Sequence, residues 1–271
     1  MFSSNLPIWY DRRNSTKMCF ANSAYILIHS NIMKTFPSVN VEIMTIDHIA
    51  TSCGFTNETG VTLSEGRIQN LVRKVTDSLR KLGHHEIDFA LTLETEPNLT
   101  EIDSRLDSGE IILAAFSTGI YNRYFQKTGR RRPCVETFEE IGLDRLPPHY
   151  VSLVGIDEGT IGILDPLCKY KIRKRPMKRS DFLDDNANLI EKMPRIEFYQ
   201  KILLNNRMDG IDFLNRELIY SNVILNQDEE GTTNKGKGKT NKKRSSSSLD
   251  TFFSIEEKND SDSREGGNLA K

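Results

Sequence analysis

The sequence contains few cysteines and no long apolar run. Its four cysteines, Cys19, Cys53, Cys134 and Cys168, show no CxxC or other paired spacing in 271 residues. A disulfide framework requires a small, cysteine-dense secreted chain, so free thiols in a reducing compartment are expected. No apolar run approaches the ~18 residues that cross a bilayer, and residues 1–13 lack the pattern of a signal peptide. We therefore expect a cytoplasmic protein without membrane contact, or a nuclear one in a eukaryote.

Net charge is also nearly absent, at −1 at pH 7, so global electrostatics favour no partner. Basic residues gather locally at 130–132 and at 169–179, where weak DNA contact is conceivable. A nuclease would need a carboxylate cluster with metal-binding spacing, and we find none. His84 and His85 are adjacent and point apart, without a suitably spaced acidic or cysteine partner. Nothing in the sequence indicates a metal or another cofactor.

Apolar spacing predicts three helices. Residues 19–33 place apolar side chains at intervals of three and four, which predicts a helix with one apolar stripe. Residues 67–82 repeat this pattern, with charges on the other face. A short helix is expected at 99–106, where Thr100 and Asp103 resemble a capping box and Ser108-Gly109 follows as a stop.

The chain divides into one folded domain and a tail. Residues 110–116 have the length and composition of a buried strand, and apolar clusters continue to about residue 225. From residue 227 hydrophobic side chains nearly vanish, so the tail cannot bury enough apolar surface to offset the entropy of ordering. We expect a domain over residues 1–226 and a disordered, basic tail over residues 227–271.

Residues 147–167 predict a β-hairpin. Two apolar runs flank a turn at residues 157–159, and β-branched residues lie on both sides. Folding about this turn brings His149 opposite, or nearly opposite, Asp165. Facing residues on an antiparallel pair lie about 5 Å apart. A carboxylate at that distance can orient an imidazole and support its protonated form.

Cys19 stands at the start of the first expected helix. A cysteine nucleophile acts as thiolate, and a helix N-terminus and a nearby imidazolium both favour that form. Cys at a helix start, HYVSLVG with His149 and ILDP with Asp165 resemble papain-superfamily cysteine peptidases, and among them the bacteriocin-processing peptidase-like group. The resemblance extends over residues 10 to 185 and includes RSDFL at 179–183.

The resemblance implies an α+β, papain-like fold, in which the Cys helix packs on an antiparallel sheet. It also implies a catalytic Cys19-His149-Asp165 triad that acts on a peptide or isopeptide bond of a protein or peptide substrate. The superfamily usually carries Gln six residues before the nucleophile as an oxyanion donor, but this sequence has Arg13 there. Asn14 is the candidate substitute, one place later. Losing one oxyanion donor typically lowers the rate about a hundred- to a thousand-fold.

Simpler interpretations stay open. A single Cys on an apolar helix is more often packing than nucleophile, and an Asp before Pro often caps a turn. Cys53 and Cys134 have no matching His and Asp and are expected to be structural. The same fold would serve an acyl transferase, in which an amine replaces water as acceptor. It would also serve a catalytically inactive adaptor, which the Arg13 departure favours.

The tail contains a further motif at residues 246–253, SSSLDTFF. It resembles the PIP box, which binds the sliding clamp PCNA. Leu249, Phe252 and Phe253 match its apolar positions, while Ser246 replaces the usual Gln. This spacing suits one 3₁₀ turn, which aligns residues i and i+3. Six Lys or Arg residues between 235 and 244 precede the motif. We therefore expect a replication clamp as a partner of the tail.

Overall fold

The structure is a computed structural model of the chain. It describes residues 6–10, 16–57, 60–61, 63–117, 148–166, 175–178, 190–204, 207–208, 211–212 and 217–225. Several sequence predictions fall outside these residues: Arg13 and Asn14, Cys134 and Cys168, RSDFL, and the whole tail with Ser246, Leu249, Phe252 and Phe253. The division at residue 226 therefore stays a prediction.

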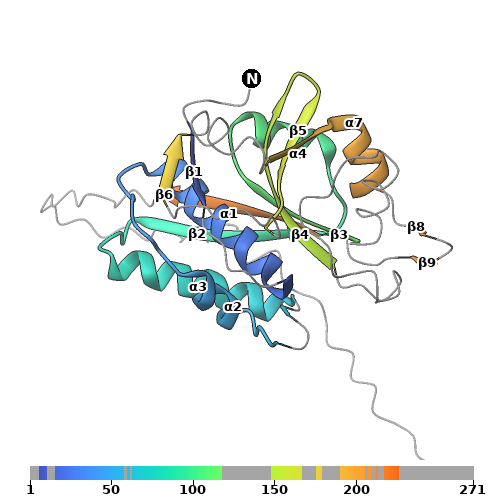
Figure 1. Cartoon of the computed structure of the whole chain (residues 1–271). Helices are drawn as coiled ribbons and strands as arrows, with labels where there is room; N and C mark the ends of the chain where they lie inside the picture. The colour runs from blue at the N-terminus through green and yellow to red at the C-terminus, as the bar shows by residue number, and fades with distance from the viewer. Residues whose placement is uncertain are drawn as a thin grey trace, which may run out of the picture. The chain divides into compact units, whose positions relative to one another are not determined.

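A six-stranded antiparallel sheet forms the centre of the fold (Figure 1). Its strand order is β2-β10-β3-β4-β5-β7, so β10, the last strand among the described residues, lies between β2 and β3. The bounds are β2 Ile87–Glu94, β3 Ile112–Ser117, β4 Pro148–Asp157, β5 Thr160–Leu164, β7 Ile190–Pro194 and β10 Glu217–Leu225. Strand β3 and the β4–β5 hairpin confirm the sequence predictions for these segments.

Helix α1, Cys19–Thr35, packs against β4, β3 and β10. The sequence predicted a helix with one apolar stripe, and this was wrong in one respect: nearly the whole circumference of α1 is buried. Its polar side chains bond to neighbouring elements instead of water, as buried polar groups must. For example, the His29 Nε2 accepts from the backbone N–H of Ile43 at 3.0 Å and of Met44 at 3.3 Å.

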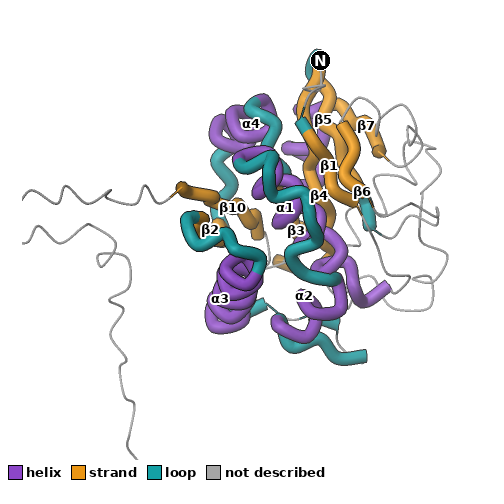
Figure 2. Tube along the Cα trace, turned by 90° about the vertical axis from the view of Figure 1, so that its left-hand side faces the viewer, coloured by secondary structure: helices purple, strands orange, loops and turns teal. Residues whose placement is uncertain are grey.

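The fold is therefore α+β, with an N-terminal helix that carries Cys19 packed on an antiparallel sheet, as expected. Apolar residues of α1, α2 (Ile46–Ser52) and α3 (Glu65–Lys81) form the core on one face of this sheet. A second core on the other face involves α4 (Leu99–Asp107), α7 (Arg195–Phe198) and the π-helix η3 (Tyr199–Leu203). Figure 2 shows α1 beside β3 and β4.

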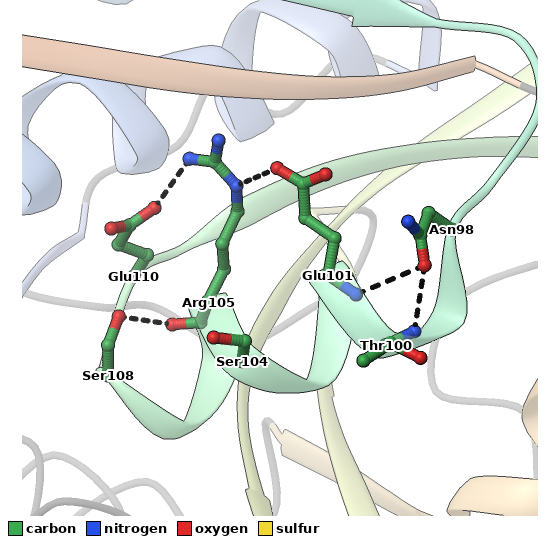
Figure 3. Close-up of a pocket in the computed structure, with 7 residues that line it drawn as sticks. All are labelled: Asn98, Thr100, Glu101, Ser104, Arg105, Ser108 and Glu110. Atoms are coloured by element: carbon green, nitrogen blue, oxygen red, sulfur yellow. Dashed lines mark hydrogen bonds and ion pairs between the residues drawn. The ribbon is translucent and has the colours of Figure 1, made fainter.

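Helix α4 begins two residues earlier than the predicted capping box implies. The N-cap is Asn98, whose Oδ1 accepts from the backbone N–H of Thr100 at 3.1 Å and of Glu101 at 3.3 Å (Figure 3). Thr100 lies inside the helix, so the predicted pairing with Asp103 is wrong. Asparagine caps a helix as well as threonine does, because its side-chain oxygen reaches the same first-turn N–H groups. The predicted stop is confirmed: Gly109 follows with φ 84°.

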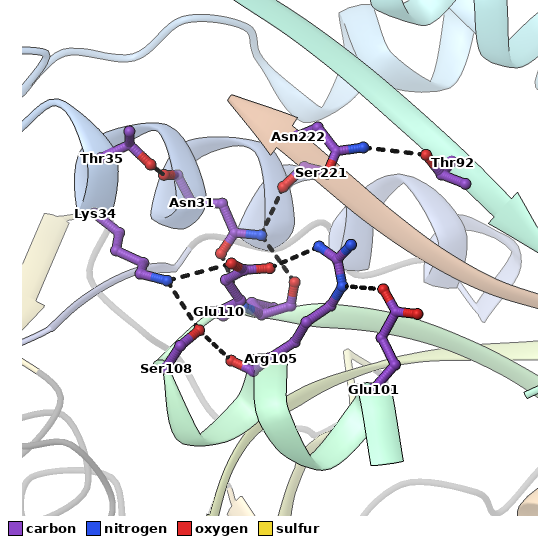
Figure 4. A network of polar contacts seen from close by, with 11 residues as sticks. Asn31, Lys34, Thr35, Thr92, Glu101, Arg105, Ser108, Glu110, Ser221 and Asn222 are labelled. Carbon is purple, nitrogen blue, oxygen red and sulfur yellow. Dashed lines mark hydrogen bonds and ion pairs between the residues drawn. The ribbon is translucent and has the colours of Figure 1, made fainter. Parts of the chain in front are cut away.

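The C-terminal half of α1 is fixed to β10 and to the segment just before β3 by polar contacts (Figure 4). The Asn31 side chain donates to the Ile111 carbonyl at 2.8 Å and accepts from the Ile111 N–H at 2.8 Å, as a neighbouring strand would. It also donates to Ser221 Oγ at 2.7 Å. Lys34 forms an ion pair with Glu110 at 3.4 Å. These contacts set the orientation of α1 across the sheet.

Two small sheets complete the described structure. Strand β1, Pro7–Tyr10, pairs with β6, Arg175–Lys178, and β8, Arg207–Met208, pairs with β9, Ile211–Asp212. Strand β6 lies within the basic segment 169–179. Among the described residues, none of the helices combines the length and apolar character needed to cross a membrane.

Candidate active site

Cys19 is the first residue of α1, directly after the 3₁₀ helix η1, Thr16–Met18. The N-cap residue of α1, Met18, makes no side-chain capping hydrogen bond. The Cys19 thiol therefore lies at a helix N-terminus whose N-cap side chain binds none of the first-turn N–H groups. Cys19 is partly exposed, whereas Cys53 is buried. Burial raises the pKa of Cys53 to about 12, against a smaller opposing influence of Arg67. Of the two thiols that the structure describes, Cys19 is the accessible one.

His149 and Asp165 meet at the open end of the β4–β5 hairpin. The hairpin closes through Glu158 and Gly159, whose φ values of 43° and 82° are those of a two-residue turn with both residues left-handed. His149 Nε2 lies 3.0 Å from Asp165 Oδ1, and the two residues are only 4% and 2% exposed. The sequence prediction of an imidazole–carboxylate pair at this hairpin agrees with that distance.

A β-bulge places this pair on one side of the hairpin. Near the turn Gly155 pairs with Gly162, but beyond the bulge Leu153 pairs with Ile163, one residue out of the earlier register. His149 lies four residues from Leu153, and Asp165 lies two from Ile163, so both share the face of that pair. Without the bulge, Leu153 would face residue 164 and the Asp165 side chain would point to the opposite face from His149. The local irregularity is thus what makes the ion pair possible.

The surroundings of His149 favour its charged form. Burial alone lowers the pKa of this imidazole, but the Asp165 carboxylate raises it by charge and by hydrogen bonding, and the Cys19 side chain adds a hydrogen bond in the same direction. The net effect raises the pKa of His149 from 6.5 to about 10. The opposing influences identify the cause: an imidazole desolvated to this extent keeps its proton only because a carboxylate faces it.

The ring of His149 therefore stands between an acid and a thiol. Nε2 lies 3.0 Å from Asp165 Oδ1, and the Cys19 side chain is among the groups that raise the pKa of the imidazole. Aromatic rings border this arrangement on both elements. Phe116, the β3 partner of His149, makes an edge contact with the imidazole at a centroid distance of 6.2 Å. Phe20, next to Cys19, makes one with Tyr150 at 5.2 Å.

One site prediction stays untested, and two other parts of the described structure were considered as sites. Asn14, the oxyanion candidate, lies outside the described residues. Within those residues no group of three His, Cys, Asp or Glu side chains is arranged to hold a metal ion. A hollow of about 560 Å³ lies beside α4. Figure 3 shows residues that line it, among which Arg105 forms ion pairs with Glu101 and Glu110. These opposite charges satisfy one another, and the residues that line the hollow include no cysteine or histidine.

Sequence reasoning missed two buried serines near the pair, Ser23 and Ser152. Ser23 Oγ donates to the Tyr150 carbonyl at 3.2 Å, and Ser152 Oγ donates to the Ser23 carbonyl at 3.4 Å. A serine inside an apolar helix segment, spaced four residues after the candidate nucleophile, was a signal that could have drawn attention to the first of them.

Comparison with known proteins gives structural resemblances only. No protein-family model matches the chain, and no curated protein sequence matches it. Among solved structures, a putative C39-like peptidase from Bacillus anthracis is similar at 13% identity and a TM-score of 0.39, over 81% of this chain and 96% of that one. A double glycine motif protease from an AMS/PCAT transporter, in complex with the leader peptide, is similar at 10% identity and a TM-score of 0.37, over 81% of this chain and 94% of that one. Neither resemblance assigns a role to any residue here.

Proposed function

We propose that the protein is a cysteine peptidase-like hydrolase that cleaves a peptide or isopeptide bond with Cys19, His149 and Asp165. The observation that carries the proposal is the buried His149–Asp165 pair at 3.0 Å, with the Cys19 side chain among the groups that raise the pKa of the His149 imidazole. The partial exposure of the thiol suits its role, since a nucleophile must reach the substrate, and burial strengthens the interaction by which Asp165 holds the imidazole.

In this mechanism one proton is shared between the thiol and the imidazole. The Asp165 carboxylate raises the pKa of His149 and so favours its imidazolium form, which lets the ring hold the proton that the thiol gives up. The thiolate attacks the carbonyl carbon, and the C–N bond then breaks as His149 gives its proton to the leaving amine. Water, deprotonated by His149, hydrolyses the thioester and restores the thiol. Asp165 orients the ring throughout.

The oxyanion formed during the attack needs hydrogen-bond donors. The backbone N–H of Cys19, at the start of α1, is one candidate, because first-turn N–H groups have no acceptor within their own helix. Asn14 is the second candidate on the sequence alone. If Asn14 does not serve, the inactive adaptor is the alternative for this fold. An acyl transferase differs only in the acceptor that resolves the thioester.

Thiol alkylation tests the proposal without knowledge of the substrate. We expect iodoacetamide at pH 6 to modify Cys19 in the full chain much faster than in the His149→Ala variant, because the variant lacks the proton acceptor. Peptide mapping by mass spectrometry separates Cys19 from Cys53 and the other cysteines. A Cys19 rate that is the same in both proteins would remove the catalytic proposal.

We further propose that residues 246–253 recruit this domain to a sliding clamp. The support is the sequence alone: Leu249, Phe252 and Phe253 at PIP-box spacing in a tail with few other apolar residues. Such a tether would raise the local concentration of the enzyme near DNA-bound protein substrates. Binding of the full chain to PCNA, measured by calorimetry, should be lost on replacing Phe252 and Phe253 with Ala, and unchanged affinity would refute the motif.

A further inference from the structure

We infer that Ser23 and Ser152 are positioning residues, which hold the Cys19 helix against the His149 strand at the distance required for proton transfer. The inference rests on the proposed function and adds two residues to it. Both side chains are 0% exposed, and neither touches the reacting atoms by its hydrogen bonds. Their role would be to set the geometry of the two groups that do.

The two serines join the same two elements in opposite directions. Ser23, on α1, donates to the backbone carbonyl of Tyr150 on β4, and Ser152, on β4, donates to the backbone carbonyl of Ser23. The distances are 3.2 Å and 3.4 Å. A reciprocal pair of bonds restrains both sliding and rotation of the helix over the strand, whereas one bond leaves rotation about it free. Apolar packing alone is less directional.

The location of the bonds connects them to the site. Ser23 follows Cys19 by four residues, and residues i and i+4 lie on the same face of a helix. Tyr150 follows His149 directly in β4. The Ser23–Tyr150 bond therefore joins α1 to β4 four residues after Cys19 and one residue after His149. A displacement of α1 at Ser23 is carried to Cys19, about 6 Å further along the helix axis.

Buried hydroxyls at these positions need an explanation beyond packing. Burying a hydroxyl offers no hydrophobic gain, and alanine would fill the same space with little change in volume. A hydroxyl is favourable here because each one finds a carbonyl acceptor on the facing element. A small error in position matters at a catalytic pair, since a misplacement of about 1 Å can lower the rate by two orders of magnitude.

The test uses Ser23→Ala and Ser152→Ala in the full chain, with Ser30→Ala as the matched control. Ser30 is also buried on α1 and its Oγ accepts from the Trp9 N–H at 2.8 Å, so its loss removes a comparable bond about two helical turns further from the site than Ser23. The readouts are the alkylation rate of Cys19 as a function of pH, followed by peptide mapping, and the thermal unfolding midpoint.

We expect each of the two variants to slow alkylation of Cys19 at pH 6 about ten-fold and to shift the pH profile toward that of an ordinary thiol. Ser30→Ala should lower the unfolding midpoint to a similar degree and leave the pH profile unchanged. Ser152→Ala removes the longer and weaker of the two hydrogen bonds, so it should disturb folding less. It still tests the inference if Ser23→Ala fails to fold.

Two results would overturn the inference while the proposed function stands. In the first, Cys19 is alkylated faster in the wild type than in His149→Ala, but both serine variants show the same pH profile of alkylation as the wild type. The other is an equal effect of Ser30→Ala, which would mean that any loosening of α1 slows the thiol. If wild-type Cys19 reacts no faster than in His149→Ala, the proposed function fails first and the positioning role falls with it.

Discussion

Replacing Asp165 with Asn tests the electrostatics of the site directly. The Asn side chain keeps the size of the carboxylate but removes the charge that faces the buried imidazole at 3.0 Å. Burial lowers the pKa of His149, and in the variant the carboxylate charge that raises this pKa is absent. Breaking a buried ion pair typically costs about 3 to 5 kcal/mol. For a domain of this size that lowers the unfolding midpoint by roughly 6 to 20 °C.

The pH dependence gives this prediction its sign. The pKa of His149 is about 10 in the folded protein and 6.5 in the unfolded reference, so the folded state binds the proton more tightly. The resulting stabilisation is complete below pH 6.5 and is lost as the pH rises through 10. Asp165→Asn removes it, so the gap in unfolding midpoint between wild type and variant should be largest near pH 6 and shrink toward pH 10.

Thermal unfolding followed by circular dichroism between pH 6 and pH 10 measures that gap. Asp103→Asn is the control, because Asp103 pairs with Arg195 at 3.2 Å and accepts a hydrogen bond from Tyr199. Arginine stays charged throughout, and burial raises the pKa of Tyr199, so its effect should be constant from pH 6 to pH 9. A gap for Asp165→Asn that does not change with pH would refute the charged pair.

Three further variants test the fold, each by urea unfolding. Asn98→Ala removes the α4 cap and should cost about 1 kcal/mol; no loss would mean that water caps the helix equally well. Gly109→Ala places a Cβ 1.7 Å from Leu6 Cδ1 at φ 84°, so we expect a loss of more than about 1 kcal/mol, and a gain would show that Leu6 lies elsewhere. Asn31→Ala leaves the N–H and carbonyl of Ile111 without that partner and should cost about 2 to 4 kcal/mol; a near-neutral result would contradict the contact.

Local sequence patterns were sufficient for the elements whose character is set by neighbouring residues. Helix α3 carries its apolar side chains on one face, and the prediction at 67–82 lies within a few residues of Glu65–Lys81. The β4–β5 hairpin followed from a two-residue turn with glycine between apolar runs. Strand β1 was missed, because the short segment Pro7–Tyr10 shows no alternation and is buried only through its distant contacts with α1 and β6.

Helix α1 shows why periodicity underestimates burial. An amphipathic pattern reports the face that is apolar, but a helix enclosed by other elements can also bury polar side chains when each one finds a partner. Asn31 bonds to Ile111, just before β3, and to β10, and His29 bonds to the segment before α2. These partners lie 14 to 190 residues away in sequence. No local window contains that information.

The position of Asp165 is the clearest case of a correct expectation that the pattern alone could not secure. Folding the hairpin about its turn brings residues 149 and 165 near one another, but strict alternation from Gly155 and Gly162 would direct their side chains to opposite faces. One extra residue in β4, between Leu153 and Gly155, reverses that outcome. Sequence patterns specify a bulge weakly, because it changes the pairing of strands and not their composition. Whether an acid and an imidazole in a hairpin can act on a thiol therefore depends on a single register shift, which a structure can establish and a motif cannot.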